Sequence, residues 1–175
     1  MRKNIKIVIF DCDGVFSDGI YSVSSNGIVT KNFYTRDFSA LEKLLKRGHI
    51  VPILTGSEDQ CFYNKCSTNK FLMKYNNLFI AHGCYDKKEF IEKGGISLFA
   101  KGRGIEAEVE DGWENIAYMG DAGNDLECMK LAAISGCPCD AEEPIIEIAD
   151  YVSPHKGGHG AIVDFVKYLL ETNNE

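Results

Sequence analysis

The sequence predicts an α/β fold: a doubly wound, mostly parallel Rossmann-like sheet in a single domain that spans residues 1–175. Short β-branched apolar runs at residues 5–10, 50–54 and 115–119 are typical of buried parallel strands. Segments with apolar residues at helical spacing lie between these runs. Strands that alternate with helices form a parallel sheet covered on both faces, and the chain is long enough for one such domain with a full core.

The first part of the chain predicts two strands, a hairpin and two helices. Ser25-Asn26-Gly27 is a hairpin turn signal between residues that favour strands. Gly48 stops a segment that has leucines at helical spacing and basic residues near its end. The expected elements are, in order, a strand at residues 5–10, a β-hairpin at about 19–34, a helix at 39–47, a strand at 50–54 and a helix at 57–70.

The middle of the chain, residues 71–112, has the least regular pattern. The runs at residues 78–81 and 96–100 are strand-like, and the charged segment between them, 86–93, is either a helix or part of a small insertion at about 84–100. A helix is expected at residues 105–110. The rest of the chain predicts a strand at 115–119, a helix at 126–133, a short strand at 151–152 and a closing amphipathic helix at 160–171.

Composition excludes several classes of function. The formal net charge is -7, which argues against a nucleic-acid partner because phosphate backbones are bound by Lys/Arg surfaces. No apolar run approaches the roughly 20 residues needed to cross a bilayer. Asp11 and Asp13 interrupt the first apolar run, which a signal peptide would not allow. The seven cysteines are scattered and odd in number, as expected for reduced thiols, so we expect a cytoplasmic protein with no membrane partner.

Polar residues follow three of the predicted strands at the point where each strand ends. Asp11 and Asp13 follow the first strand, Thr55-Gly56 the second, and Gly120-Asp121 the strand at residues 115–119. Ligands of open parallel sheets bind outside the carboxyl ends of the strands. One edge of the sheet is therefore expected to bring these side chains together.

These residue types suit phosphate-ester hydrolysis. Neighbouring carboxylates repel one another unless a cation joins them, and Mg²⁺ prefers carboxylate oxygens. An aspartate shielded by the metal can attack phosphorus, and a second acid, Asp13, can protonate the leaving alcohol and later activate water. A hydroxyl from Thr55 and a lysine would hold the remaining phosphate oxygens, while Gly56 lets the backbone approach closely. Asp125 would hold a metal-bound water or a backbone N–H group.

The motifs resemble those of the haloacid dehalogenase superfamily of phosphatases. The residues that carry this resemblance are Asp11-Cys12-Asp13-Gly14-Val15-Phe16-Ser17-Asp18-Gly19, Thr55-Gly56 and Gly120-Asp121-Ala122-Gly123-Asn124-Asp125. The hairpin, Lys31-Asn32-Phe33-Tyr34-Thr35-Arg36-Asp37 and Gly157-Gly158-His159-Gly160-Ala161 resemble its small, capless branch. That branch contains 3-deoxy-D-manno-octulosonate 8-phosphate phosphatase, keto-deoxy-nonulosonate phosphatases and the phosphatase-like domain of acylneuraminate cytidylyltransferases.

The resemblance implies roles for these residues. Asp11 would be the nucleophile and Asp13 the acid/base, with Mg²⁺ held by the Asp11 carboxylate, the Asp13 carbonyl oxygen and Asp121. It also implies a homotetramer in which the hairpin and neighbouring subunits cover each open site. The candidate metal-binding residues are Asp11, Asp13, Asp121 and Asp125, and the candidate substrate- or phosphate-binding residues are Gly14, Gly56, Arg36, Asn124 and His159.

Two positions depart from the pattern of the family. His159 stands where the family loop, Gly-Gly-Arg-Gly, has arginine. For the phosphate-gripping lysine, Lys87 lies in a Gly-x-x-Asp-Lys segment like that of the family, but it is farther than usual from Gly120. Lys101, after a strand-like run, has a spacing closer to that of the wider superfamily, so both lysines remain candidates.

Three functions remain open. The first is hydrolysis of a small sugar-acid phosphate, such as a 3-deoxy-octulosonate 8-phosphate or a nonulosonate 9-phosphate. The second is a phosphatase of unrelated small-molecule specificity, because a fold does not fix a substrate. The third is a non-catalytic oligomerisation domain related to acylneuraminate cytidylyltransferase tails. The complete set of motif residues favours an enzyme, a phosphoric monoester hydrolase.

Overall fold

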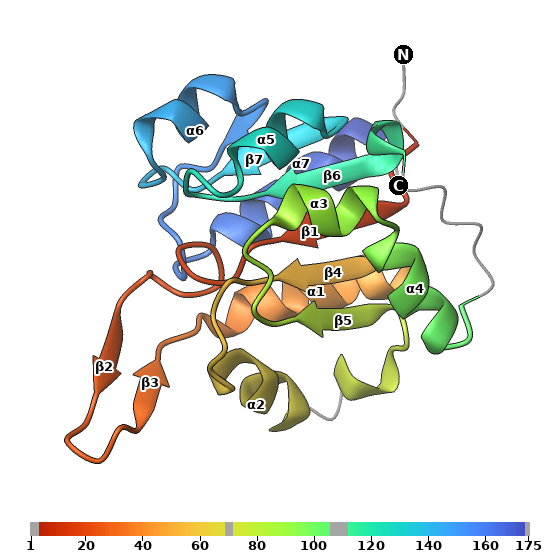
Figure 1. The fold of residues 1–175 in the computed structure, drawn as a ribbon. Coiled ribbons are helices and arrows are strands. Elements are labelled where there is room, and N and C mark those ends of the chain that lie inside the picture. Colours follow the sequence, from red (N-terminus) through yellow and green to blue (C-terminus); the bar gives the residue numbers. More distant parts are fainter. Residues whose placement is uncertain (1–3, 69–71, 106–111, 174–175) are drawn as a thin grey trace.

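A six-stranded parallel sheet forms the centre of the molecule (Figure 1). The computed structural model describes residues 4–68, 72–105 and 112–173. In spatial order the strands are β5 (Leu78–Ala81), β4 (Val51–Leu54), β1 (Ile7–Phe10), β6 (Ile116–Met119), β7 (Ile134–Cys137) and β8 (Tyr151–Val152). The predicted α/β class is therefore confirmed.

Each central strand is apolar on both sides because helices cover both faces of the sheet. In β1, Val8 and Phe10 belong to one buried cluster, and Ile7 and Ile9 belong to the other. Successive side chains of a strand point to opposite faces, so a continuous apolar run is what a doubly covered strand requires. The two clusters fix β1 from above and below and give the residue after it, Asp11, a rigid support.

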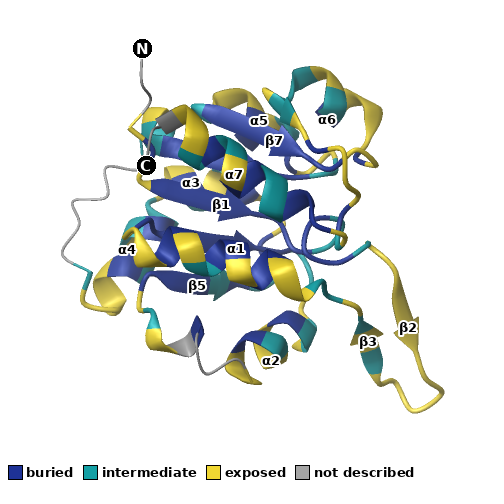
Figure 2. Ribbon diagram, turned by 180° about the vertical axis from the view of Figure 1, so that it is seen from behind, coloured by how far each residue is buried: buried dark blue, intermediate teal, exposed yellow. Residues whose placement is uncertain are grey.

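The helices form two layers (Figures 1 and 2). On one face, α1 (Thr35–Lys46) and α7 (Ala161–Asn173) lie side by side, and α2 (Cys61–Thr68) contributes Phe62 to the same cluster. The opposite face carries α3 (Lys87–Glu92), α4 (Gly95–Gly102), α5 (Leu126–Leu131) and α6 (Glu143–Ile148). Two short 3₁₀ turns, η1 (Leu72–Lys74) and η2 (Trp113–Asn115), precede β5 and β6.

The predicted hairpin is present between β1 and α1. Its strands, β2 (Tyr21–Val23) and β3 (Val29–Lys31), pair antiparallel, with Tyr21 opposite Lys31. Gly27, in the turn, has a φ of 80°, a conformation that glycine adopts without steric cost. The hairpin projects from the body on the side where the parallel strands end (Figure 1), and β2 is exposed along its length (Figure 2).

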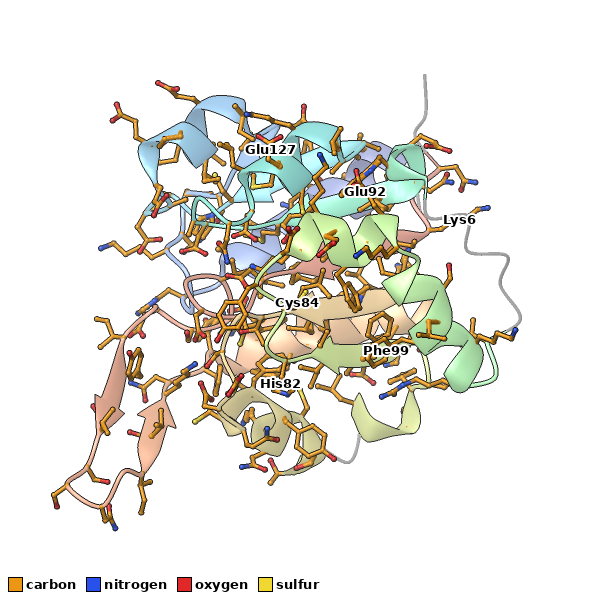
Figure 3. All side chains as sticks on the ribbon, viewed as in Figure 1. Lys6, His82, Cys84, Glu92, Phe99 and Glu127 are labelled. Carbon is orange, nitrogen blue, oxygen red and sulfur yellow. The ribbon has the colours of Figure 1, made fainter. Side chains whose placement is uncertain are left out.

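The prediction of a strand at residues 96–100 is wrong, because this run lies within α4. Its burial follows a helical period: Ile96 and Ala100 are buried, whereas Leu98 is 72% exposed. Phe99, labelled in Figure 3, stacks on Phe79 of β5, and their ring centroids are 4.9 Å apart. A short apolar run fits either state in the sequence, and packing over the sheet decides for the helix.

Two elements have no counterpart in the sequence prediction: β7 and α6. β7 contains Gly136, and glycine is uncommon in strands. A side chain at Gly136 would place its Cβ 2.5 Å from the Phe165 ring, so a close approach of α7 requires glycine here.

The bounds of the other elements follow the prediction with small shifts. α1 begins at Thr35 rather than 39, and α2 begins at Cys61 rather than 57. The helix predicted at 105–110 falls almost wholly outside the described residues. All seven cysteines are free thiols, as expected. No helix within the described ranges is long and apolar enough to cross a membrane.

Candidate active site

The candidate site lies where β4, β1 and β6 end. Asp11 follows β1 directly, Thr55 follows β4 and Asp121 lies two residues beyond β6. β1 lies between the other two strands, and the chain continues from it to β4 on one side and returns through β6 on the other. This is the switch point at which doubly wound sheets bind their ligands. The predicted convergence of polar residues at this edge is thus observed.

Three carboxylates meet at this edge. Asp11, Asp121 and Asp125 each offer an oxygen, and these oxygens lie within 4.8 Å of one another. Asp11 and Asp125 are buried, and Asp121 is half-buried. The Asp13 carboxylate does not belong to this cluster; whether its carbonyl oxygen is a metal ligand, as the resemblance implies, stays a prediction.

Lys87, the first residue of α3, neutralises part of this charge. Its Nζ lies 2.6 Å from Asp11 Oδ1 and 2.7 Å from Asp125 Oδ1, and its side chain is fully buried. Burial lowers the pKa of Lys87, but the two carboxylates outweigh burial and hold that pKa above its usual range. The loop before α3 is fixed by a hydrogen bond from Cys84 N–H to the Thr55 carbonyl oxygen, 2.8 Å, and Cys84 is marked in Figure 3.

Asp125 organises the loop after β6. Besides Lys87, it accepts hydrogen bonds from the Tyr118 hydroxyl at 2.7 Å and from the N–H groups of Asp121 and Ala122 at 3.1 and 3.3 Å. It occupies the N-cap position of α5, but its side chain makes no capping hydrogen bond to that helix. A Cβ at Gly120 would lie 2.4 Å from the Asp125 carboxyl carbon, so glycine makes room for this arrangement.

The electrostatics favour a cation at this cluster. Burial, followed by the negative charge of Asp125, raises the pKa of Asp11 to about 6 even with Lys87 beside it. Burial and the charges of Asp11 and Asp125 raise the pKa of Asp121 to about 8. Asp121 Oδ1 is a buried oxygen without a hydrogen-bond partner among the described residues. An unpartnered oxygen among repelling carboxylates fits a hard divalent cation such as Mg²⁺.

Gly14 is required by the close approach of the Asp121 side chain. Its φ is +84°, and a Cβ at this position would lie 1.9 Å from Asp121 Oδ2. A Cβ on Gly157 would in turn lie 1.8 Å from the Gly14 carbonyl oxygen. The loop that carries His159 therefore packs directly against the loop after β1, which places the late glycine motif beside the site.

Asp13 has partners of its own. Lys31 Nζ, from β3 of the hairpin, lies 2.7 Å from Asp13 Oδ1 and 2.8 Å from Oδ2, and Ser17 Oγ donates to Oδ1 at 3.1 Å. The same Nζ lies 2.5 Å from Asp59 Oδ2, in the loop after β4. Lys31 and Asp59 are not among the site residues predicted from the sequence, because nothing in the local pattern shows that a hairpin lysine folds back to this edge.

Thr55 and Gly56 occupy the expected loop after β4. Thr55 is buried, and its Oγ1 accepts a hydrogen bond from Ser57 N–H at 3.1 Å, which leaves the hydroxyl hydrogen able to donate. A Cβ at Gly56 would lie 3.4 Å from the Tyr85 ring. The phosphate-binding roles of both residues stay predictions.

Of the two candidate lysines, only Lys87 reaches the carboxylates. Lys101 is an exposed residue of α4, which lies toward the opposite edge of the sheet from the site (Figure 1). The role of Lys101 in holding phosphate stays a prediction, but its position on α4 favours Lys87. Because the run at 96–100 is helical, Lys101 does not follow the end of a strand.

Arg36, Asn124 and His159 are exposed and do not belong to the carboxylate cluster. His159 Nδ1 donates to the Gly157 carbonyl oxygen at 2.7 Å, since a carbonyl can only accept. Asp37, which follows Arg36, is buried and accepts from Val163 N–H at 3.2 Å, so it is not part of a surface pair. Burial raises the pKa of Asp37 to about 6.

Known proteins are similar to this chain in sequence and in fold. The chain is 30% identical over 171 residues to the 3-deoxy-D-manno-octulosonate 8-phosphate phosphatase KdsC of Salmonella typhi, covering 96% of this chain and 80% of that protein. This chain belongs to the 3-deoxy-D-manno-octulosonate 8-phosphate phosphatase family. Members of this family are phosphoric monoester hydrolases, as the sequence predicts. No protein-family model matches the chain.

Solved structures agree with this family assignment. A 3-deoxy-D-manno-octulosonate 8-phosphate phosphatase from Vibrio cholerae superposes with a TM-score of 0.80 at 30% identity, covering 99% of this chain and 87% of its own. The Moraxella catarrhalis phosphatase of the same name, solved with magnesium, phosphate and KDO, superposes with a TM-score of 0.76 at 27% identity, covering 98% and 89%.

The raised pKa values of Asp121 and Asp11 predict that cation binding strengthens with pH. Without metal, the folded protein keeps these two carboxyls protonated at pH values where the unfolded chain has lost the protons. The resulting stabilisation is complete below the ordinary pKa of 3.8 and is lost as pH rises through the folded-state pKa values of about 6 for Asp11 and about 8 for Asp121. A divalent cation must displace the proton, so its affinity should rise by up to about tenfold per pH unit between pH 6 and 8.

The measurement is thermal unfolding with and without Mg²⁺ at pH 6 and pH 8. At a concentration of about 100 times the Kd at pH 8, Mg²⁺ should raise the Tm by roughly 5–10 °C at pH 8 and by much less at pH 6. Asp121→Asn should remove this difference. An equal gain at both pH values in the unmodified protein would contradict the prediction.

Proposed function

We propose that this protein is a magnesium-dependent phosphatase that hydrolyses a small sugar-acid phosphate monoester through an aspartyl phosphate on Asp11. One observation carries the proposal: the buried Lys87 ammonium bridges Asp11 and Asp125, next to an Asp121 oxygen that has no hydrogen-bond partner among the described residues. This arrangement supplies a nucleophile, a fixed positive charge and room for a cation at one point. Those are the parts that transfer of a phosphoryl group requires.

In the proposed reaction Asp11 attacks phosphorus while Lys87 and the Thr55 hydroxyl hold the phosphoryl oxygens. Asp13 gives a proton to the departing sugar oxygen and later accepts one from the water that cleaves the aspartyl phosphate. Asp11 and Asp121 would hold Mg²⁺, together with the Asp13 carbonyl oxygen by resemblance. The bound ion would shield the carboxylates from the phosphate dianion. Asp125 holds Lys87 and the loop of Asp121 in place.

The proposed substrate class is a 3-deoxy-octulosonate 8-phosphate or a nonulosonate 9-phosphate. It is supported by the names of the relatives and by coverage of nearly the whole chain. His159 favours a second candidate, a phosphatase with a different small-molecule substrate. With Nδ1 donating to Gly157, the neutral ring offers only an acceptor at Nε2, so it could attract a substrate carboxylate only as the imidazolium.

We further propose that the protein assembles as a homotetramer through the hairpin. Ile20, Tyr21, Val23 and Ile28 are each between 58% and 70% exposed in one chain. Apolar residues gathered on a projecting element indicate a surface that is covered in the assembled state. The non-catalytic alternative would also use this surface, but it would not require the cluster around Lys87.

The first test of the proposed activity is phosphate release from a panel of sugar phosphates in the presence of Mg²⁺. The panel includes 3-deoxy-octulosonate 8-phosphate, nonulosonate 9-phosphates and unrelated hexose phosphates. We expect one keto-deoxy acid to exceed the rest, and Asp11→Asn to lower its turnover by at least about 10³-fold because the nucleophile is removed. Activity on unrelated phosphates alone would overturn the substrate class, and a metal-loaded protein active on none would overturn the enzyme proposal.

The lysine assignment is tested by two matched variants. Lys87→Met should lower kcat by about 10²–10³-fold, because the phosphoryl oxygens lose a buried charge-assisted donor. Lys101→Met removes an exposed lysine of α4 and should leave kcat within about twofold. Circular dichroism checks that both variants fold. The assignment fails if Lys101→Met loses activity and Lys87→Met retains it.

The proposed assembly is tested by the mass in solution. Light scattering should give about four times the 19.5 kDa of one chain. Ile20→Glu combined with Val23→Glu should dissociate the assembly, because charges would be buried in an apolar contact. Leu98→Glu, an equally exposed apolar residue on α4, is the control and should leave the mass unchanged. A monomeric wild-type protein would contradict the tetramer.

A further inference from the structure

Lys31 joins three segments of the chain that are distant in the sequence. It ends β3 of the hairpin, and its Nζ reaches Asp13 after β1 and Asp59 after β4. Its side chain is only 4% exposed, although most of the hairpin around it is open to solvent. A lysine that leaves an exposed strand to be buried against two carboxylates loses hydration and conformational freedom, so its contacts must compensate for both.

The geometry at Asp13 fixes the plane of its carboxylate. Lys31 Nζ lies 2.7 and 2.8 Å from the two oxygens, so one ammonium spans both. Ser17 Oγ adds a hydrogen bond to Oδ1 at 3.1 Å. On the far side, Asp59 and Ser57 hold the ammonium, at 2.5 and 3.5 Å from Nζ. Asp13 itself stays 34% exposed, so solvent and small molecules can still reach its carboxylate.

We propose that Lys31 is a positioning residue for the reaction: it orients the Asp13 carboxyl for proton transfer to the leaving oxygen and from the attacking water. This inference rests on the proposed function and adds a residue of the hairpin to those that support the reaction. The role is indirect, since Lys31 acts through Asp13 and through its anchors in the loop after β4. A proton transfer in the transition state requires a donor and acceptor held within hydrogen-bond reach, and a freely rotating carboxyl would meet that condition only part of the time.

The two steps of the reaction depend on Asp13 in different ways. In the first step a bond forms between an Asp11 oxygen and phosphorus, the bond from phosphorus to the leaving oxygen breaks, and Asp13 gives that oxygen its proton. A nitrophenolate leaves as a stable anion and needs no proton. In the second step water attacks phosphorus, Asp13 takes a water proton, and the Asp11 oxygen leaves. This step needs Asp13 for every substrate.

A second interpretation is that Lys31 only ties the hairpin to the body. In that case its removal would disturb the site as a whole and would slow both steps. If instead Lys31 positions Asp13, its removal spares the first step for a nitrophenyl substrate and slows the second. Aspartyl phosphate then accumulates, and nitrophenolate appears in a burst before a slow steady rate.

The experiment is stopped-flow hydrolysis of p-nitrophenyl phosphate with Mg²⁺, together with steady-state turnover of the best sugar phosphate found for the wild type. Lys31→Met should give a burst approaching one nitrophenolate per chain, and its kcat on the sugar phosphate should fall by about 10²-fold. Asp13→Asn should give the same burst. Lys31→Arg keeps the positive charge, so its kcat on the sugar phosphate should be at least about tenfold higher than that of Lys31→Met.

Lys167→Met is the matched control, because Lys167 is an exposed lysine paired with Glu171 at 3.8 Å on α7. It should behave as the wild type. Should Lys31→Met fail to fold, Lys31→Gln replaces it in the same assay. Equal losses on both substrates without a burst would overturn the positioning role while leaving the proposed function intact. A wild type that hydrolyses neither substrate would instead overturn the proposed function and this inference with it.

Discussion

The bridge from Lys87 to Asp11 and Asp125 is the interaction on which the site depends. Three carboxylates within 4.8 Å of one another would repel strongly in a buried setting, and each would favour its neutral form. One ammonium at 2.6 and 2.7 Å compensates part of this charge and joins α3 to the ends of β1 and β6. With all three acids ionised, one positive charge against three negative charges leaves a deficit of two, which is the charge of one divalent cation.

The backbone around this bridge is shaped for close contact between charged groups. Asp125 accepts from two N–H groups of its own loop, and this is possible only because Gly120 has no side chain. Gly14 gives Asp121 a similar clearance on the other side. The two apolar clusters on either face of the sheet hold β1 and β6 in register, with Phe10 opposite Met119. Rigid strands and small residues together let charged groups sit close without strain in the chain.

Much of this arrangement could be predicted from the sequence. Asp11, Thr55 and Asp121 each follow an apolar run, and parallel strands must bring such positions to one edge. The choice between Lys87 and Lys101 could not be made, because it depends on whether residues 96–100 form a strand or a helix, and a five-residue apolar run fits both. β7 escaped prediction because Gly136 makes room for the Phe165 ring and Ser135 bonds Asp150, and strand propensity reflects neither contact.

The role of Lys31 could be predicted from the sequence even less than that of Lys87. Its partners Asp13 and Asp59 lie far from it along the chain, on the ends of two different strands, and no local pattern records that meeting. The contact also connects the site to the least supported part of the molecule. Among the described residues, β2 and β3 pair as strands only with each other, and Lys31 is a buried anchor that ties them to the body. In the proposed tetramer, the subunits that cover the hairpin would restrict the same element that holds Asp13. Assembly would then support proton transfer through a single lysine, without placing any residue of a neighbouring subunit on the phosphate.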